Sequence, residues 1–149
     1  YTLRMKRTGG KKIEDELSSY NDLYEGTYVI ESVKGDTVTD AYTVVFDSDT
    51  ALYFPESLDL QVFDLDEDGQ PEFSLGQKIG SSAMEYHFYT LTSQGKIKEY
   101  RKENHSSLVI ITDGREGYAP AFQVKNGEIT YYAYDQKTAK TVKKVKKVV

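Results

Sequence analysis

Short runs of β-branched and aromatic residues, separated by glycine-containing turns, recur along most of the chain. Tyr86–Thr90 and Thr130–Tyr134 are among the most strand-like runs, and the turn signals Lys34-Gly35-Asp36, Gln94-Gly95 and Asn126-Gly127 stand between neighbouring runs. β-Branched and aromatic side chains favour the pleated strand, and Asn-Gly accepts the positive φ angles of a two-residue hairpin turn. The spacing therefore predicts an all-β fold, mostly an antiparallel meander, built as a sandwich, an open barrel or a partial propeller.

Seven segments carry this strand pattern, and one segment carries a helical pattern. Apolar residues recur at helical spacing over Ile13–Tyr24, and three acidic residues stand in its first turn, where they suit the helix dipole. We therefore expect a short N-terminal helix there. The expected strands are Thr27–Val33, Thr37–Phe46, Glu85–Ser93, Lys96–Arg101, Ser107–Ile111, Phe122–Val124 and Glu128–Tyr134.

The chain of 149 residues has the length of one domain, and no linker rich in Pro, Gly or Ser divides it. We therefore expect a single β-rich domain over residues 1–149. In the segment Lys137–Val149, valines recur every three residues with lysine pairs between them. We interpret this segment as a basic tail or as an edge strand protected by lysines. No run is long and apolar enough to span a bilayer, so no transmembrane segment is expected.

Charge is segregated along the chain. Residues 13–77 hold 17 acidic residues against Lys34 alone, a net charge of −16, whereas the two flanking blocks are basic. A dense acidic sequence repels itself unless it packs against basic segments or binds cations. The pattern favours a solvated acidic face or a cation site within residues 13–77, and we expect no nucleic-acid partner.

The segment 62–76 carries the one motif with recognisable chemistry. Asp64, Asp66 and Asp68 occupy alternate positions of a short loop, and Gly69 follows where the chain must turn sharply. Hard oxygen atoms that converge on one point suit Ca²⁺, which takes about six to eight of them. The predicted ligands of one Ca²⁺ are the carboxylates of Asp64, Asp66, Asp68 and Glu72 and the backbone carbonyl of Gln70.

This loop is not an EF-hand, because Leu75 stands where an EF-hand has its bidentate Glu and the flanks alternate as strands do. The segment instead resembles the FG-GAP or VCBS-type calcium repeat of integrin alpha chains and bacterial surface proteins. The shared pattern is Asp-x-Asp-x-Asp-Gly, with Glu72 in place of the last Asp and Phe73-x-Leu75-Gly76 as the exit. The resemblance implies the same ligand set and covers this one segment, whereas the family builds a propeller from several repeats.

These observations lead to one main expectation about function and two alternatives. We expect a non-enzymatic binding or structural module, secreted or held at a bacterial cell surface, for example as a lipoprotein, with one structural Ca²⁺ and an unknown protein or glycan partner. Because Tyr1 rather than Met stands first, we expect a signal segment to be missing from the sequence. One alternative is an extracellular hydrolase, or its accessory subunit, that uses acidic residues such as Glu56 and Asp59. The other is an inhibitor or partner-binding protein that recognises opposite charge.

No catalytic residue is identified from the sequence. The chain has no cysteine and no Gly-x-Ser-x-Gly motif, so the usual local signals of a nucleophilic enzyme are missing. Acid–base carboxylate pairs act across a cleft, and their separation depends on the fold.

Overall fold

The computed structural model is built from β-strands in the residues that it describes. These residues hold twelve strands and no helix, and so no helix long and apolar enough to cross a membrane. Every strand pair among them is antiparallel, and no closed barrel forms. The all-β, antiparallel expectation is therefore confirmed. The described residues are 1–14, 22–46, 51–56, 58, 60–79, 83–100, 107–111 and 121–148.

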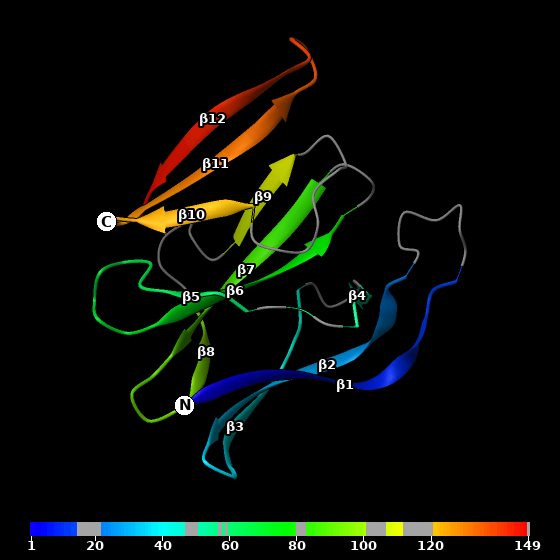
Figure 1. Cartoon of the computed structure of the whole chain (residues 1–149), viewed down its shortest axis with the longest axis vertical. Helices are drawn as coiled ribbons and strands as arrows, with labels where there is room; N and C mark the ends of the chain where they lie inside the picture. The colour runs from blue at the N-terminus through cyan, green and yellow to red at the C-terminus, as the bar shows by residue number, and fades with distance from the viewer. Residues whose placement is uncertain are drawn as a thin grey trace.

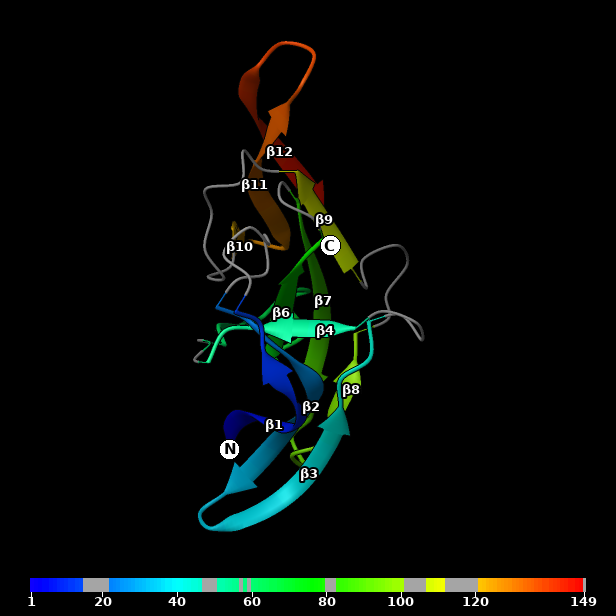
Figure 2. The same ribbon diagram turned by 90° about the vertical axis from the view of Figure 1, so that its right-hand side faces the viewer.

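The strands form three sheets, which Figures 1 and 2 show arranged along the long axis of the molecule. The N-terminal sheet contains β1 (Thr2–Lys12), β2 (Tyr24–Lys34), β3 (Thr37–Thr43) and β4 (Leu52–Phe54). The central sheet contains β5 (Val62–Phe63), β6 (Glu72–Lys78), β7 (Ala83–Leu91), β8 (Ile97–Glu99) and β9 (Ser107–Ile111). The C-terminal sheet contains β10 (Phe122–Lys125), β11 (Glu128–Asp135) and β12 (Lys140–Lys147). Within each sheet, neighbouring strands follow one another along the chain, except that β4 pairs with β2 and β9 pairs with β7.

One face of the central sheet packs against the N-terminal sheet. Phe73 of β6 lies opposite Tyr89 of β7, and the two rings stack with their centroids 5.3 Å apart. Both rings join a buried core with Tyr28, Ile30 and Phe54 of the N-terminal sheet. Because side chains alternate between the two faces of a strand, the intervening residues of β6 and β7 point the other way.

The opposite face of the central sheet packs against the C-terminal sheet. Tyr86 and Phe88 of β7 and Ile110 of β9 form a second core with Phe122 and Ile129. The Phe122 ring meets the rings of Tyr86 and Phe88 edge to face, with centroids 5.0 Å and 5.7 Å away. The bulky side chains on both faces of β7 are therefore each covered by another sheet.

The turns fall where the sequence predicts them. Gly35, Gly95 and Gly127 have φ angles of 61°, 77° and 67°, which glycine adopts without steric strain. All seven expected strands are present, and their ends differ from the expected ends by up to three residues in the described part of the chain.

The short N-terminal helix expected over Ile13–Tyr24 is not seen. The N–H of Ile13 donates to the carbonyl of Leu23, and the N–H of Asp22 donates to the carbonyl of Ile13. These bonds continue the pairing of β1 with β2, and β2 begins at the last residue of the expected helix. Strand pairing therefore decides the structure at both ends of the segment, and residues 15–21 lie outside the described residues.

The space beside Gly76 is filled by a neighbouring aromatic ring, so this position has no room for a side chain. It lies opposite Tyr86 in the ladder between β6 and β7, and a Cβ built on Gly76 would overlap the Tyr86 ring. That ring is held in place, because it packs against Phe122 and its hydroxyl accepts the N–H of Ala121. We predict that Gly76→Ala lowers the free energy of unfolding by about 1–3 kcal/mol, the usual cost of overpacking, as measured by urea denaturation.

Gly9→Ala is the matched control for this prediction. A Cβ built on Gly9 of β1 meets no atom within 4 Å, so its substitution should change the free energy of unfolding by less than ~0.5 kcal/mol. Equal effects of the two substitutions would show that the contact between Gly76 and Tyr86 is not tight.

Candidate metal-binding loop

The acidic loop connects β5 to β6, the first hairpin of the central sheet. Phe63 pairs with Glu72 across this hairpin, which brings the two ends of the loop together. Leu65 anchors the loop from inside, since its side chain is fully buried in the core shared with the C-terminal sheet. The N–H of Leu65 also donates to Oε2 of Glu72 at 2.8 Å. An apolar residue between two aspartates therefore holds the acidic loop against the sheet.

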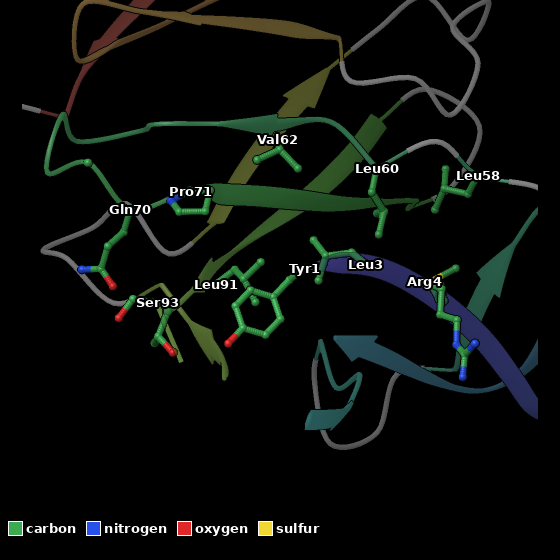
Figure 3. A pocket seen from close by; sticks show the side chains of 13 residues that line it. Tyr1, Leu3, Arg4, Leu58, Leu60, Val62, Gln70, Pro71, Leu91 and Ser93 are labelled. Atoms are coloured by element: carbon green, nitrogen blue, oxygen red, sulfur yellow. The ribbon is translucent and has the colours of Figure 1, made fainter. Parts of the chain in front are cut away.

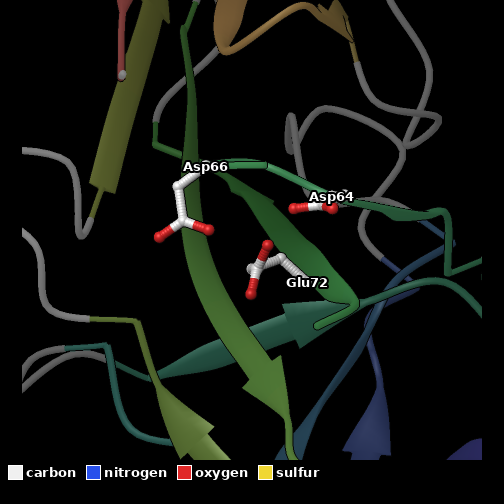
Figure 4. Close-up of side chains that lie close together, drawn as sticks. All are labelled: Asp64, Asp66 and Glu72. Carbon is white, nitrogen blue, oxygen red and sulfur yellow. The ribbon is translucent and has the colours of Figure 1, made fainter. Parts of the chain in front are cut away.

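Three of the five predicted ligands come together. One carboxylate oxygen from each of Asp64, Asp66 and Glu72 lies within 4.8 Å of the other two. Figure 4 shows Asp64 and Asp66 extending from the loop and Glu72 from the start of β6, all toward one small region. The burial of the three differs, because Asp64 is exposed, Asp66 is half-buried and Glu72 is 1 % exposed.

Glu72 is the most perturbed acidic group of the site. Burial is the largest cause that raises the pKa of Glu72 to about 7, and the nearby charges of Asp66 and Asp68 act in the same direction, against the lowering effect of the hydrogen bond from Leu65. A hydrogen bond with the side chain of Thr90 also lowers it. A buried carboxylate surrounded by like charge is destabilising when it ionises, so this position favours either a proton or a cation.

The other two predicted ligands bond to each other. Oδ1 of Asp68 accepts the N–H of Gln70 at 2.8 Å, and its Oδ2 lies 3.2 Å from the Gln70 side-chain nitrogen. Asp68 is not a member of the three-carboxylate cluster among the described residues. Gly69 has a φ angle of 84° and donates its N–H to Oδ2 of Asp64 at 3.0 Å. The sharp turn at Gly69 is therefore present, and Asp64 caps it.

Sequence reasoning missed one further member of the site. The hydroxyl of Tyr100 donates to Oδ2 of Asp66 at 3.2 Å, and burial together with the Asp66 carboxylate raises the pKa of Tyr100. Tyr100 follows β8 and is distant from the loop in the chain, so no local pattern could have connected them. Tyr100, Lys98 and the loop residues line a shallow hollow of about 350 Å³ above Glu72.

A larger groove adjoins the loop on the other side. It has a volume of about 660 Å³ and lies between β1 and the β5–β6 hairpin. Figure 3 shows Leu3 of β1 and Leu60 facing each other across it, with Gln70 and Pro71 of the acidic loop at its rim. One wall of an apolar groove is therefore made by the predicted metal-binding loop.

The acidic pair named for a hydrolase lies only partly within the described residues. Glu56 is exposed after β4, and Asp59 lies outside the described residues. The structure therefore does not test this pair.

The shifted pKa of Glu72 predicts an unusual dependence of stability on pH in chelator. Its folded-state pKa of about 7 lies above the ordinary 4.5, so the native state holds this proton more tightly than the unfolded chain does. Its contribution to stability is fully present below pH 4.5 and is lost as pH rises toward 7. We predict that the free energy of unfolding of the wild type, relative to Glu72→Gln, falls by ~3 kcal/mol across this range.

The measurement is urea denaturation of both proteins at several pH values in the presence of chelator. Glu67→Gln is the control, because Glu67 is an exposed residue of the same loop and its substitution removes the same charge. Its pH profile should run parallel to that of the wild type. Parallel profiles for the wild type and Glu72→Gln would instead show that Glu72 titrates normally.

Comparisons with known proteins assign no family to the chain. No protein-family model, no curated protein and no solved structure matches the chain. The likeness of the loop to the FG-GAP or VCBS-type repeat therefore remains a prediction from its residues.

Proposed function

We propose that the chain is a non-enzymatic binding module, secreted or displayed at a bacterial cell surface, in which one structural Ca²⁺ orders the acidic loop. The convergence of Asp64, Asp66 and Glu72 carries this proposal, because their ligand oxygens lie within 4.8 Å of one another. Carboxylates this close repel one another when ionised, and a divalent cation converts that repulsion into attraction. The loop resembles a calcium repeat in sequence, and the cluster supplies an independent geometric reason for a cation.

The donor set suits Ca²⁺ better than other metals. All the predicted ligands are hard oxygens, and Ca²⁺ accepts irregular sets of carboxylates, carbonyls and waters. Zn²⁺ sites are usually built from cysteine and histidine, and the loop has neither. Asp68 would join the three clustered carboxylates by giving up its hydrogen bonds with Gln70, whereas the backbone carbonyl of Gln70 takes no part in those bonds.

The acidic loop forms part of a groove, and this position suggests a role for ordering the loop. Gly69, Gln70 and Pro71 line the apolar groove of about 660 Å³ together with residues of β1. A cation that fixes the loop therefore also fixes this wall of the groove. We propose that the groove contacts the protein or glycan partner and that the ion shapes it without taking part in chemistry.

Burial disfavours the alternative in which the same carboxylates catalyse hydrolysis. A raised pKa suits a general acid, but a catalytic acid must lie within hydrogen-bond reach of its substrate. Glu72 is 1 % exposed, and the N–H of Leu65 occupies its Oε2. A structural role fits such a group better than proton transfer to a substrate does.

Calcium binding predicts a specific gain in thermal stability. A ligand that binds only the native state at a hundredfold excess over its dissociation constant adds about 2.7 kcal/mol, which corresponds to about 5–10 °C for a domain of this size. We predict this rise when Ca²⁺ is added to chelator-treated protein, and a smaller rise with Mg²⁺. Differential scanning calorimetry in chelator, Ca²⁺ and Mg²⁺ measures it.

Asp66→Asn should abolish the Ca²⁺ response, since it removes a charged ligand while preserving the shape of the side chain. Glu67→Gln should retain the response, because Glu67 is exposed and does not belong to the cluster. The readout is the difference in melting temperature between chelator and Ca²⁺ within each variant. Any change that the substitution makes to the stability of the metal-free protein therefore cancels. An unchanged melting temperature of the wild type in millimolar Ca²⁺ would rule the proposal out.

A further inference from the structure

The C-terminal sheet ends in a strand whose outer edge is open among the described residues. β12 pairs with β11 along its whole length and with no other described strand. Figures 1 and 2 show the β11–β12 hairpin extending beyond the central sheet at one end of the molecule. An edge of this kind presents backbone N–H and C=O groups that a further strand can bind.

The ladder determines which residues of β12 face this open edge. Val148 donates its N–H to the carbonyl of Gly127, and bonded and non-bonded pairs alternate along an antiparallel ladder. The even-numbered residues of β12 therefore bond to β11, and the odd-numbered residues direct their backbone groups outward. These outward-facing residues are Thr141, Lys143, Val145 and Lys147.

Lysines flank the open edge on both faces of the sheet. Lys143 and Lys147 extend from one face, and Lys140 and Lys144 extend from the other, since side chains alternate along a strand. All four are exposed, and none forms an ion pair with a carboxylate of the described residues. The edge therefore carries four lysines outside any ion pair of the described residues, and of these Lys143 and Lys144 lie opposite tyrosines rather than carboxylates.

The middle of the edge combines this charge with exposed apolar surface. Glu128 and Asp135 of β11 lie opposite the two ends of β12, whereas Lys143 lies opposite Tyr132. Tyr132 and Val145 are 59 % and 52 % exposed on the same face. The middle of the edge therefore offers both positive charge and apolar surface to a partner.

We propose that β12 binds an extended acidic segment of another protein, which adds to the C-terminal sheet as a further strand. Its backbone would bond to the outward-facing groups of β12, and its carboxylates would meet lysines on both faces of the sheet. An apolar residue of the segment would pack on Tyr132 and Val145. This binding mode uses no residue of the acidic loop, so it is independent of the proposed calcium site.

Charge and geometry together select this partner. Two β12 edges brought together would place lysine against lysine, so a second copy of the edge is disfavoured, as lysines at sheet edges generally ensure. An acidic strand reverses the sign of that interaction. A polypeptide also supplies N–H and C=O groups at the spacing of the edge, which a nucleic acid or an anionic glycan does not.

The test uses fluorescence anisotropy with a labelled peptide of about ten residues, made of Glu and Val and carrying acidic residues on both faces. Two further forms of the peptide are N-methylated, one on its odd residues and one on its even residues. Strand addition predicts that one methylated form binds like the unmodified peptide and that the other binds at least about tenfold more weakly, because it loses several hydrogen bonds. Attraction by charge alone would leave both forms equal.

Single variants of the protein complete the test. Lys143→Gln and Lys144→Gln should each weaken binding of the peptide about threefold, whereas Lys11→Gln, on exposed β1, should have no effect. Equal binding in chelator and in Ca²⁺ would support the independence of this surface from the calcium site. Three results would overturn the proposal: equal binding of both methylated peptides, binding of oligothymidine or heparin in preference to the peptide, or self-association of the protein that Lys143→Gln strengthens.

Discussion

Burial of β7 on both faces is the constraint that organises the three sheets. Tyr86 and Phe88 enter the core shared with the C-terminal sheet, and Tyr89 enters the core shared with the N-terminal sheet. Burying a large aromatic side chain contributes about 2 kcal/mol or more, so neither face of this strand is stable in water. Each outer sheet forms its core with the central sheet rather than with the other outer sheet. The fold therefore depends on β7, whose side chains are buried only when one sheet covers each of its two faces.

The same constraint explains why the acidic loop gathers its charges. β6 is the neighbour of β7, and the six residues from Glu72 to Gln77 are all buried. Glu72 is the first of them and pairs with Thr90, so the pairing of β6 with β7 draws its carboxylate out of solvent. Leu65 is buried in the second core, which brings Asp64 and Asp66 back over Glu72. Packing energy thus holds together charges that would otherwise separate.

Local patterns predicted most of the fold, and pairing between distant segments decided the rest. A strand run or a turn glycine can be recognised from a few neighbouring residues. The pattern of that kind over Ser107–Ile111 predicted β9 with its observed bounds. β1 was not expected, because it contains two adjacent glycines and five basic residues. It becomes a strand through its pairing with β2, which no local pattern reports. The expected helix was wrong for the same reason, since the hydrogen bonds of Ile13 with Leu23 and with Asp22 continue that pairing.

The site divides in the same way into what spacing predicts and what the fold adds. The spacing of the loop predicted that Asp64, Asp66, Asp68 and Glu72 would converge, and in the structure an oxygen from each of Asp64, Asp66 and Glu72 lies within 4.8 Å of the other two. Asp68 departs from the predicted set because a hydrogen bond to Gln70, two residues on, is available locally and competes with a position in the cluster. The burial of Glu72 and its contact with the Asp66–Tyr100 pair depend on β7 and β8, which lie far along the chain. Spacing therefore identifies candidate ligands, whereas the sheet decides which of them are buried.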